Sequence, residues 1–281
     1  PAPCANDLHV KLSPPPPGVI RLLFLGDIFG DPGRRAVIDL IPKLKESAAI
    51  DFVIVNAENS AGGRGVTPKI AIALMRAGAA VITSGDHIWD QAEIIDYMAG
   101  EPRMLRPLNY PPGTPGQGSV VLETAKGKVA VMNAQGRTFT NPPLENPFLA
   151  TAAEAARLRE ETPVIFLDFH AEATSEKIAM GWHLDGVVSA VVGTHTHVQT
   201  ADERILPNGT AHLTDAGMCG PEDSVIGSRV EPVLQRFRTS MPARFFVAQG
   251  PVRVSGACID VDTTTGRALS IIRVSERWSE P

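Results

Sequence analysis

The stretch Val191-Val192-Gly193-Thr194-His195-Thr196-His197 is the one around which the fold can be inferred. The apolar residues 187–192 predict a buried strand, which Gly193 ends. Two histidines follow two positions apart, and an extended backbone would point both imidazoles to the same side. Neutral imidazole is the commonest metal ligand, and open α/β sheets place active sites at the carboxyl ends of their strands. A His-x-His pair alone is as typical of surface residues as of a metal site. The residues at the ends of the other predicted strands must therefore decide between the two.

Four further apolar runs predict strands that end in polar side chains. They are residues 19–25 followed by Asp27, 52–55 followed by Glu58 and Asn59, 80–83 followed by Asp86 and His87, and 163–169 followed by His170. Between the first of these runs, apolar residues recur at helical spacing and predict helices. Thr67 followed by Pro68 predicts the start of one helix, because threonine is a favourable N-cap residue and proline is favourable in the first helical turn. Alternating strands and helices predict parallel sheets whose carboxyl ends carry these groups.

The second half of the chain adds antiparallel elements. Residues 119–132 and 252–274 predict hairpins, 147–160 and 174–185 predict helices, and 215–227 predicts a glycine-containing loop. The arrangement indicates two sheets, partly parallel and partly antiparallel, flanked by helices. We expect one domain over residues 19–281. Residues 1–18 contain four consecutive prolines, Pro14 to Pro17, and predict a disordered extension.

Composition limits the classes of function. The chain has 281 residues, of which 43% are hydrophobic and 20% charged, as in an ordinary globular protein. Its net charge of −5 gives no general reason to bind nucleic acid or an anionic membrane, and no apolar run approaches a membrane span. Three cysteines without CxxC spacing favour a reducing compartment, so we expect a cytoplasmic protein.

Six potential metal ligands follow the predicted strands. They are Asp27, Glu58, Asp86, His170, His195 and His197. Mixed carboxylate and imidazole ligands suit zinc, manganese or iron. Six ligands are too many for one ion with an open position, whereas two ions about 3.5 to 4 Å apart would use them all. Each residue alone could instead cap a helix or form a turn, but their joint placement favours a metal site.

The chain resembles the calcineurin-like metallophosphoesterases, specifically their YmdB-like bacterial branch. The motifs that carry the resemblance are Gly26-Asp27-Ile28-Phe29-Gly30, Asn56-Ala57-Glu58-Asn59-Ser60, Gly85-Asp86-His87, Asp168-Phe169-His170-Ala171-Glu172, Gly193-Thr194-His195-Thr196-His197 and Thr214-Asp215-Ala216-Gly217. The resemblance implies a four-layer α/β/β/α sandwich of two mixed sheets. It also implies a dinuclear iron or manganese centre, with zinc as the alternative, and phosphodiesterase activity on 2′,3′- or 3′,5′-cyclic nucleotides.

The resemblance also assigns roles to residues. It implies Asp27 and His197 on one metal, Glu58 as the bridge, and Asp86, His170 and His195 on the other metal. A bridging hydroxide would be the nucleophile. Asn59 would contact the substrate phosphate or the metal, and His87 would protonate the leaving oxygen or bind the phosphate.

Two positions depart from the family pattern. Phe29 replaces a metal-binding histidine of the broader superfamily, as is usual in the YmdB-like branch, and Asp86 stands where asparagine is usual. Two divalent ions and three carboxylates give the metal centre a net charge of about +1, and a bound hydroxide lowers this charge to about zero. Such a low charge would weaken the attraction for a phosphate anion. We therefore expect either one trivalent iron or a protonated Asp86.

Two other functions remain open from the sequence. The first is a phosphomonoesterase or protein phosphatase with the same metals. The second is a regulatory protein with a vestigial site that binds RNA or protein, although the complete ligand set speaks against it. Arg64 and Arg137 are equally consistent with phosphate binding and with solvation. We expect a small phosphodiester substrate, no nucleic acid as the main partner, and a homo-oligomer.

Overall fold

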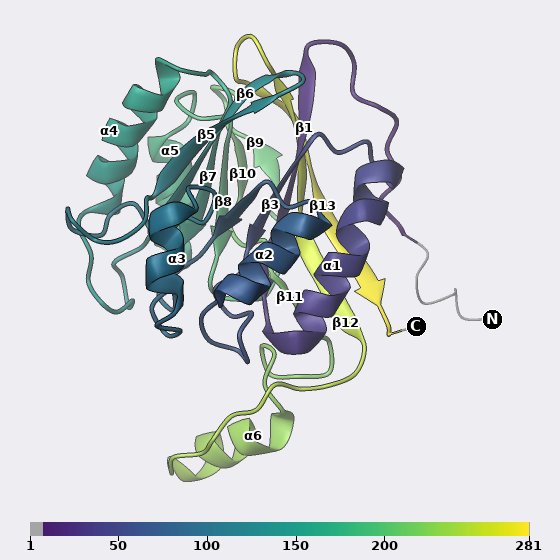
Figure 1. Ribbon diagram of the computed structural model, residues 1–281, viewed down its shortest axis with the longest axis vertical. Helices are drawn as coiled ribbons and strands as arrows, with labels where there is room; N and C mark the ends of the chain where they lie inside the picture. The colour runs from purple at the N-terminus through teal and green to yellow at the C-terminus, as the bar shows by residue number, and fades with distance from the viewer. Residues whose placement is uncertain (1–7, 281) are drawn as a thin grey trace.

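A computed structural model describes residues 8–280 of the chain. Two mixed sheets face each other, and helices cover both outer faces (Figure 1). The first sheet has the order β2 (Asp27–Ile28), β11 (Met218–Pro221), β12 (Val252–Asp262), β1 (Val19–Leu25), β3 (Phe52–Asn56) and β4 (Val81–Thr83), and β13 (Ala268–Trp278) also pairs with β12. The second has the order β5 (Ser119–Thr124), β6 (Gly127–Gln135), β7 (Ile165–His170), β8 (Ala190–Thr194), β10 (Ala211–Leu213) and β9 (Arg204–Ile205). The predicted four-layer sandwich is confirmed.

The described residues contain six helices, and all but the last lie in the two outer layers. They are α1 (Gly30–Ser47), α2 (Pro68–Ala77), α3 (Ile94–Gly100), α4 (Pro147–Arg159), α5 (Thr174–His183) and α6 (Val230–Thr239). Buried residues of α1, α2 and α3 pack on the first sheet, and those of α4 and α5 pack on the second. In α2, the hydroxyl of Thr67 accepts a hydrogen bond from the backbone N–H of Ile70, as the predicted cap requires.

Strand β1 shows why the central strands read as continuous apolar runs. All seven of its residues are buried, because one face lies under helices and the other lies between the sheets. Leu23 and Leu25 point into the core between the first sheet and its helices, which we call the first core. Phe24 points between the sheets and packs against Phe166, with ring centroids 5.0 Å apart. Burying each such side chain stabilises the fold by roughly 1.5 to 3 kcal/mol.

Parallel pairing brings the carboxyl ends of the central strands to one edge of each sheet. Strands β1, β3 and β4 are parallel, and so are β6, β7, β8 and β10. In the second sheet the register places His170, the last residue of β7, beside Thr194, the last residue of β8. The segments that follow these strands therefore converge between the two sheets.

Two parts of the chain differ from the sequence prediction. The loop predicted for 215–227 contains β11, whose Gly220 and Pro221 give no strand signal but whose backbone pairs with both β2 and β12. Residues 8–18 are attached to the domain, because Leu8, Val10 and Leu12 pack against the first core and the N–H of Val10 donates to the Glu276 carboxylate at 2.7 Å. Residues 1–7 of the predicted extension lie outside the described residues.

The connection between β11 and β12 projects from the body and carries α6 (Figure 1). We call residues 226–250 the arm. Within α6 only Val233 is buried, and Phe237 is 81% exposed. Helix α6 was not predicted from the sequence, because its apolar residues do not pack on a sheet. Among the helices within residues 8–280, none combines the length and apolar character needed to cross a membrane.

Candidate metal centre and cleft

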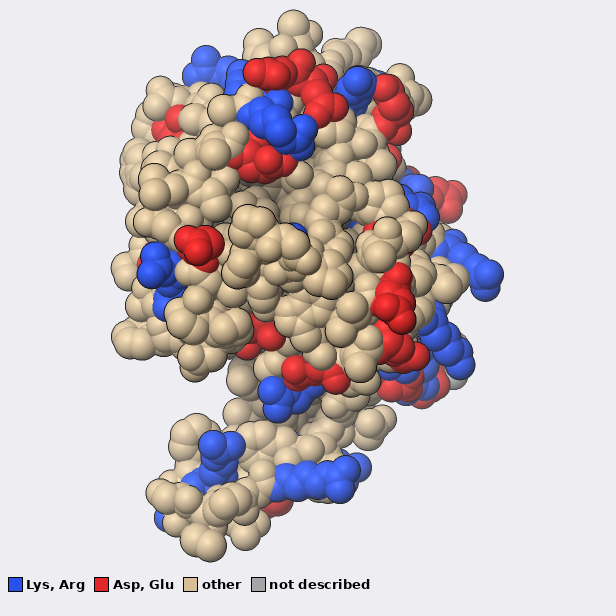
Figure 2. All heavy atoms as spheres, turned by 60° about the vertical axis from the view of Figure 1, so that its left-hand side comes forward, with Lys and Arg blue, Asp and Glu red and all other residues tan. Residues whose placement is uncertain are grey.

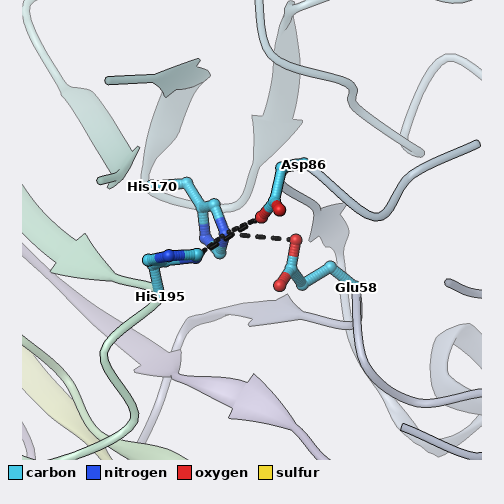
Figure 3. Close-up of side chains that lie close together, drawn as sticks. All are labelled: Glu58, Asp86, His170 and His195. Carbon is cyan, nitrogen blue, oxygen red and sulfur yellow. Dashed lines mark hydrogen bonds and ion pairs between the residues drawn. The ribbon is translucent and has the colours of Figure 1, made fainter. Parts of the chain in front are cut away.

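Four predicted ligands meet where the strands end. Glu58, Asp86, His170 and His195 each offer one ligand atom, and these atoms all lie within 4.8 Å of one another (Figure 3). The Nε2 atom of His170 lies 3.1 Å from Glu58 Oε2 and 3.1 Å from Asp86 Oδ1. The two carboxylates follow β3 and β4 of the first sheet. In the second sheet, His170 ends β7 and His195 follows β8. The cluster is therefore assembled from both sheets.

Gly85 permits this close approach. A Cβ atom at this position would lie 2.2 Å from both Glu58 Oε2 and His170 Nε2. Such contacts are far inside van der Waals distance, so any larger residue would displace two of the four clustered side chains. The glycine that precedes Asp86 is thus a packing requirement of the cluster.

Asp27 lies against the cluster and is fully buried. Its Oδ2 atom accepts a hydrogen bond from the backbone N–H of His195 at 3.0 Å, whereas its Oδ1 atom has no hydrogen-bond partner among the described residues. Burial raises the pKa of Asp27, and the nearby His197 and His170 only partly oppose this. His170 Nδ1 lies 3.7 Å from Oδ1, too far for a hydrogen bond. A buried carboxylate oxygen without a hydrogen bond is costly, and a bound cation would satisfy it. The residues present therefore fit a metal centre.

The two histidines of the opening motif diverge. β8 ends at Thr194, and the backbone then turns, with φ of 94° at His195 and 66° at His197. The predicted extended geometry is wrong at these positions, because positive φ reverses the local direction of the chain. His195 joins the cluster, whereas the Nε2 atom of His197 lies 3.2 Å from Asn59 Oδ1. Its Nδ1 atom donates to the carbonyl of Ile226 in the arm, at 3.2 Å.

A cleft of about 480 Å³ opens beside the cluster. One side is polar and includes the candidate residues Glu58, Asn59, His87, His195 and His197, together with Arg64 and Glu172. The other side is apolar and includes Phe29, Ile226, Phe245, Phe246 and Val247. All eight predicted site residues therefore lie in the cluster, against it or along the cleft.

Comparison with known proteins identifies the family. A family model described as YmdB-like protein matches residues 23–274. The chain belongs to the YmdB-like family. It is 51% identical over 255 residues to a Bacillus subtilis protein named 2′,3′-cyclic-nucleotide 2′-phosphodiesterase, in a match that covers 91% of this chain and 96% of the relative.

Solved structures agree with this YmdB-like assignment. A hypothetical protein from Thermus thermophilus matches with a TM-score of 0.84 and 40% identity, covering 93% of this chain and 100% of that chain. A novel phosphatase from Mycoplasma pneumoniae matches with a TM-score of 0.86 and 36% identity, covering 92% and 94%. The YmdB-like protein is thus a phosphoester hydrolase of the metallophosphoesterase type, and the predicted resemblance is confirmed.

A hydrogen-bonded chain orients His170 in this YmdB-like protein. The Thr194 hydroxyl lies 2.9 Å from His170 Nδ1 and donates to Asp168 Oδ1 at 2.7 Å. Asp168 also accepts from Thr83 and Asn56. Because the hydroxyl proton goes to Asp168, Thr194 accepts from Nδ1–H, so a neutral His170 would carry its lone pair on Nε2, the atom that faces the cluster.

His195 has a matching arrangement. Its Nε2 atom lies 3.0 Å from Glu172 Oε2, while its Nδ1 atom lies 3.0 Å from His170 Nε2. In a neutral His195, Glu172 would hold the proton on Nε2 and leave the Nδ1 lone pair free for a metal ion. No role was predicted for Glu172 from the sequence, although it stands two residues after His170 in the same motif.

The cluster perturbs its own ionisable groups. Burial would raise the pKa of Glu58 and Asp86, yet His170 outweighs burial at Glu58, and hydrogen bonds from His170 and His195 do so at Asp86, so both pKa values fall below their usual range. Burial would lower the pKa of His170, but Glu58 and Asp86 raise it well above its usual value. Without a metal, these hydrogen bonds favour an ionised Asp86, which argues against the protonated form considered from the sequence.

Proposed function

We propose that this YmdB-like protein hydrolyses 2′,3′-cyclic nucleotides, breaking the bond between phosphorus and O2′ and leaving a 3′-phosphate. The observation that carries the proposal is the convergence of clustered ligands and the unpartnered Asp27 oxygen beside an open cleft. The name of the Bacillus subtilis relative supports this substrate over the 3′,5′-cyclic alternative. A homo-oligomeric state remains a prediction from the sequence.

The proposed ligand assignment follows the sequence prediction. Asp27 and His197 would hold one ion, Asp86, His170 and His195 the other, and Glu58 both. Two such ions would lower the pKa of water to near 7 and offset the charge of the phosphoryl oxygens. Iron or manganese suits the mixed donors. With Asp86 ionised, two divalent ions leave only about +1 on the centre, which favours the trivalent-iron alternative.

Asp168→Asn is expected to weaken metal binding although Asp168 is no proposed ligand. An amide NH₂ facing Thr194 would donate to its hydroxyl, and that hydroxyl would then donate to His170 Nδ1. The imidazole proton would move to Nε2, the side that faces the cluster. We expect Mn²⁺ affinity to fall by about 10- to 100-fold. Competition titration measures it, with Thr194→Ser as a control that keeps the hydroxyl; an unchanged affinity would rule out the orienting role.

Metal affinity is expected to rise with pH. Metal binding requires neutral His170, but the neighbouring carboxylates raise its pKa well above the usual value, so at neutral pH the metal-free protein holds a proton there. Below that raised pKa, binding releases the proton, and affinity should increase about tenfold per pH unit. Mn²⁺ titrations at pH 6, 7 and 8 in several buffers would show this; a flat profile without proton release would contradict it.

A substrate panel tests the proposed activity. The metal-loaded protein would be assayed on 2′,3′-cyclic and 3′,5′-cyclic nucleotides, bis-p-nitrophenyl phosphate and p-nitrophenyl phosphate. We expect the highest kcat/KM on the 2′,3′-cyclic substrates. Phosphomonoesterase activity is the second candidate, because the solved Mycoplasma pneumoniae structure is described as a novel phosphatase. Faster hydrolysis of p-nitrophenyl phosphate than of every diester would favour that candidate.

A further inference from the structure

The arm contributes two consecutive phenylalanines to the lining of the cleft beside the candidate metal centre. Phe245 and Phe246 line the cleft and remain 41% and 46% exposed. We propose that this pair, which we call the aromatic wall, is the binding site for the nucleobase of the substrate. The proposal rests on the proposed function and adds to it the residues that would distinguish nucleotides from other phosphodiesters.

The aromatic wall is held by backbone hydrogen bonds. The N–H of Arg229 donates to the carbonyl of Phe246 at 2.9 Å, and the N–H of Ala248 donates to the carbonyl of Gly227 at 2.9 Å. These bonds pair the two ends of the arm where it leaves the body. The hydrogen bond from His197 to Ile226 then connects this paired base to the candidate metal centre. A wall fixed in this way needs little ordering when a ligand binds.

The rings suit a base that is attached to an anion. Planar bases stack on aromatic side chains, and this contact tolerates any base because each has a π face. Arg229 and Arg244 lie over Phe246, with guanidinium carbons 5.9 and 5.2 Å from the ring centroid, whereas Arg236 lies over Phe245 at 5.5 Å. These cations bring positive charge to the rings. Phe245, with fewer arginines over it in the described part of the chain, offers the freer surface.

Charge and size favour the same ligand. The arm contains four arginines, Arg229, Arg236, Arg238 and Arg244, and a single carboxylate, Glu231. Figure 2 shows its basic side chains on the lobe below the body. The arm is therefore attractive to an anion, in contrast to the carboxylates of the cluster. The cleft volume of about 480 Å³ lies in the range of sites that enclose small organic ligands.

The decisive experiment compares substrates with and without a base. Wild-type, Phe245→Ala and Phe246→Ala proteins would be assayed on 2′,3′-cyclic AMP and on glycerol 1,2-cyclic phosphate, which has the same five-membered cyclic diester but no base. We expect either alanine variant to lower kcat/KM for the nucleotide about 5- to 100-fold, mainly through KM, and to leave the base-free diester within about twofold. Phe237→Ala is the matched control, because this phenylalanine lies in α6 outside the cleft.

The alternative outcomes separate the explanations. Equal losses on both substrates would overturn the proposal, and a change in oligomeric state with those losses would make the wall a contact between copies of the chain. Recovery of nucleotide KM in Phe245→Trp would support stacking. If the wild type hydrolyses neither substrate, the proposed function fails. Calorimetric binding of adenosine 3′-phosphate then decides the inference by itself: weaker binding to Phe245→Ala than to Phe237→Ala supports it, and equal binding overturns it.

Discussion

Replacing His170 by alanine is expected to lower kcat/KM for 2′,3′-cyclic AMP by at least about 1000-fold, which corresponds to about 4 kcal/mol of transition-state stabilisation. His170 Nε2 lies between both clustered carboxylates, at 3.1 Å from Glu58 and from Asp86. Its removal takes away a proposed ligand and the imidazole that lies between these two carboxylates. The metal content of the purified variant should fall together with its activity.

The control for this experiment is His183→Ala. His183 ends α5, and its Nε2 atom donates to the carbonyl of Phe148 at 3.0 Å, away from the cleft. This variant loses an imidazole but should keep its activity and its metal. Activity and metal content would be measured on both variants after folding has been checked by circular dichroism. A His170→Ala protein that keeps its metal and a tenth or more of the wild-type rate would refute the proposed ligand assignment.

Replacing His87 by alanine is expected to lower turnover about 100- to 10,000-fold on cyclic nucleotides, the range for a lost general acid. His87 lines the cleft, and its Nδ1 atom lies 3.2 Å from Asp90 Oδ2, which orients the ring. Its Nε2 atom lies 3.9 Å from Asp86 Oδ2, at the edge of the cluster. From there it can protonate a departing ribose oxygen, a poor leaving group that needs the proton.

A good leaving group provides the control for His87. The p-nitrophenolate ion departs without a proton, so His87→Ala should lose much less activity on bis-p-nitrophenyl phosphate than on 2′,3′-cyclic AMP. Asp90→Asn should show the same pattern with a smaller loss, because it removes only the group that orients the ring. Equal losses on both substrates would argue against the acid role and leave phosphate binding as the function of His87.

The strand ends could be predicted because burial on both faces makes the central strands continuous apolar runs. Residues 19–25 therefore stood out from their neighbours, and Asp27 marked the point where this run ends. The same logic located Glu58, Asp86 and His170. Since parallel strands direct their carboxyl ends to a common edge, convergence of these residues followed from topology alone.

Other parts of the site depend on contacts that a single sequence does not contain. The Asp168–Thr194–His170 chain requires β7 to pair with β8 in a register that sets His170 beside Thr194. The divergence of His195 and His197 results from positive φ angles, for which these residue types give little signal. Phe245 and Phe246 form a cleft wall only because the arm folds back, although two consecutive phenylalanines after Arg244 were a visible hint.

The cluster takes two of its side chains from each sheet, so a bound cation would act as a tie between the two halves of the sandwich. Ligands that bind only the native state stabilise it by mass action, by about 2.7 kcal/mol at one hundred times the dissociation constant. The availability of metal would then affect the stability of the folded protein as well as its catalytic rate. In metal-poor surroundings the chain would open more often between its sheets and become easier for proteases to remove.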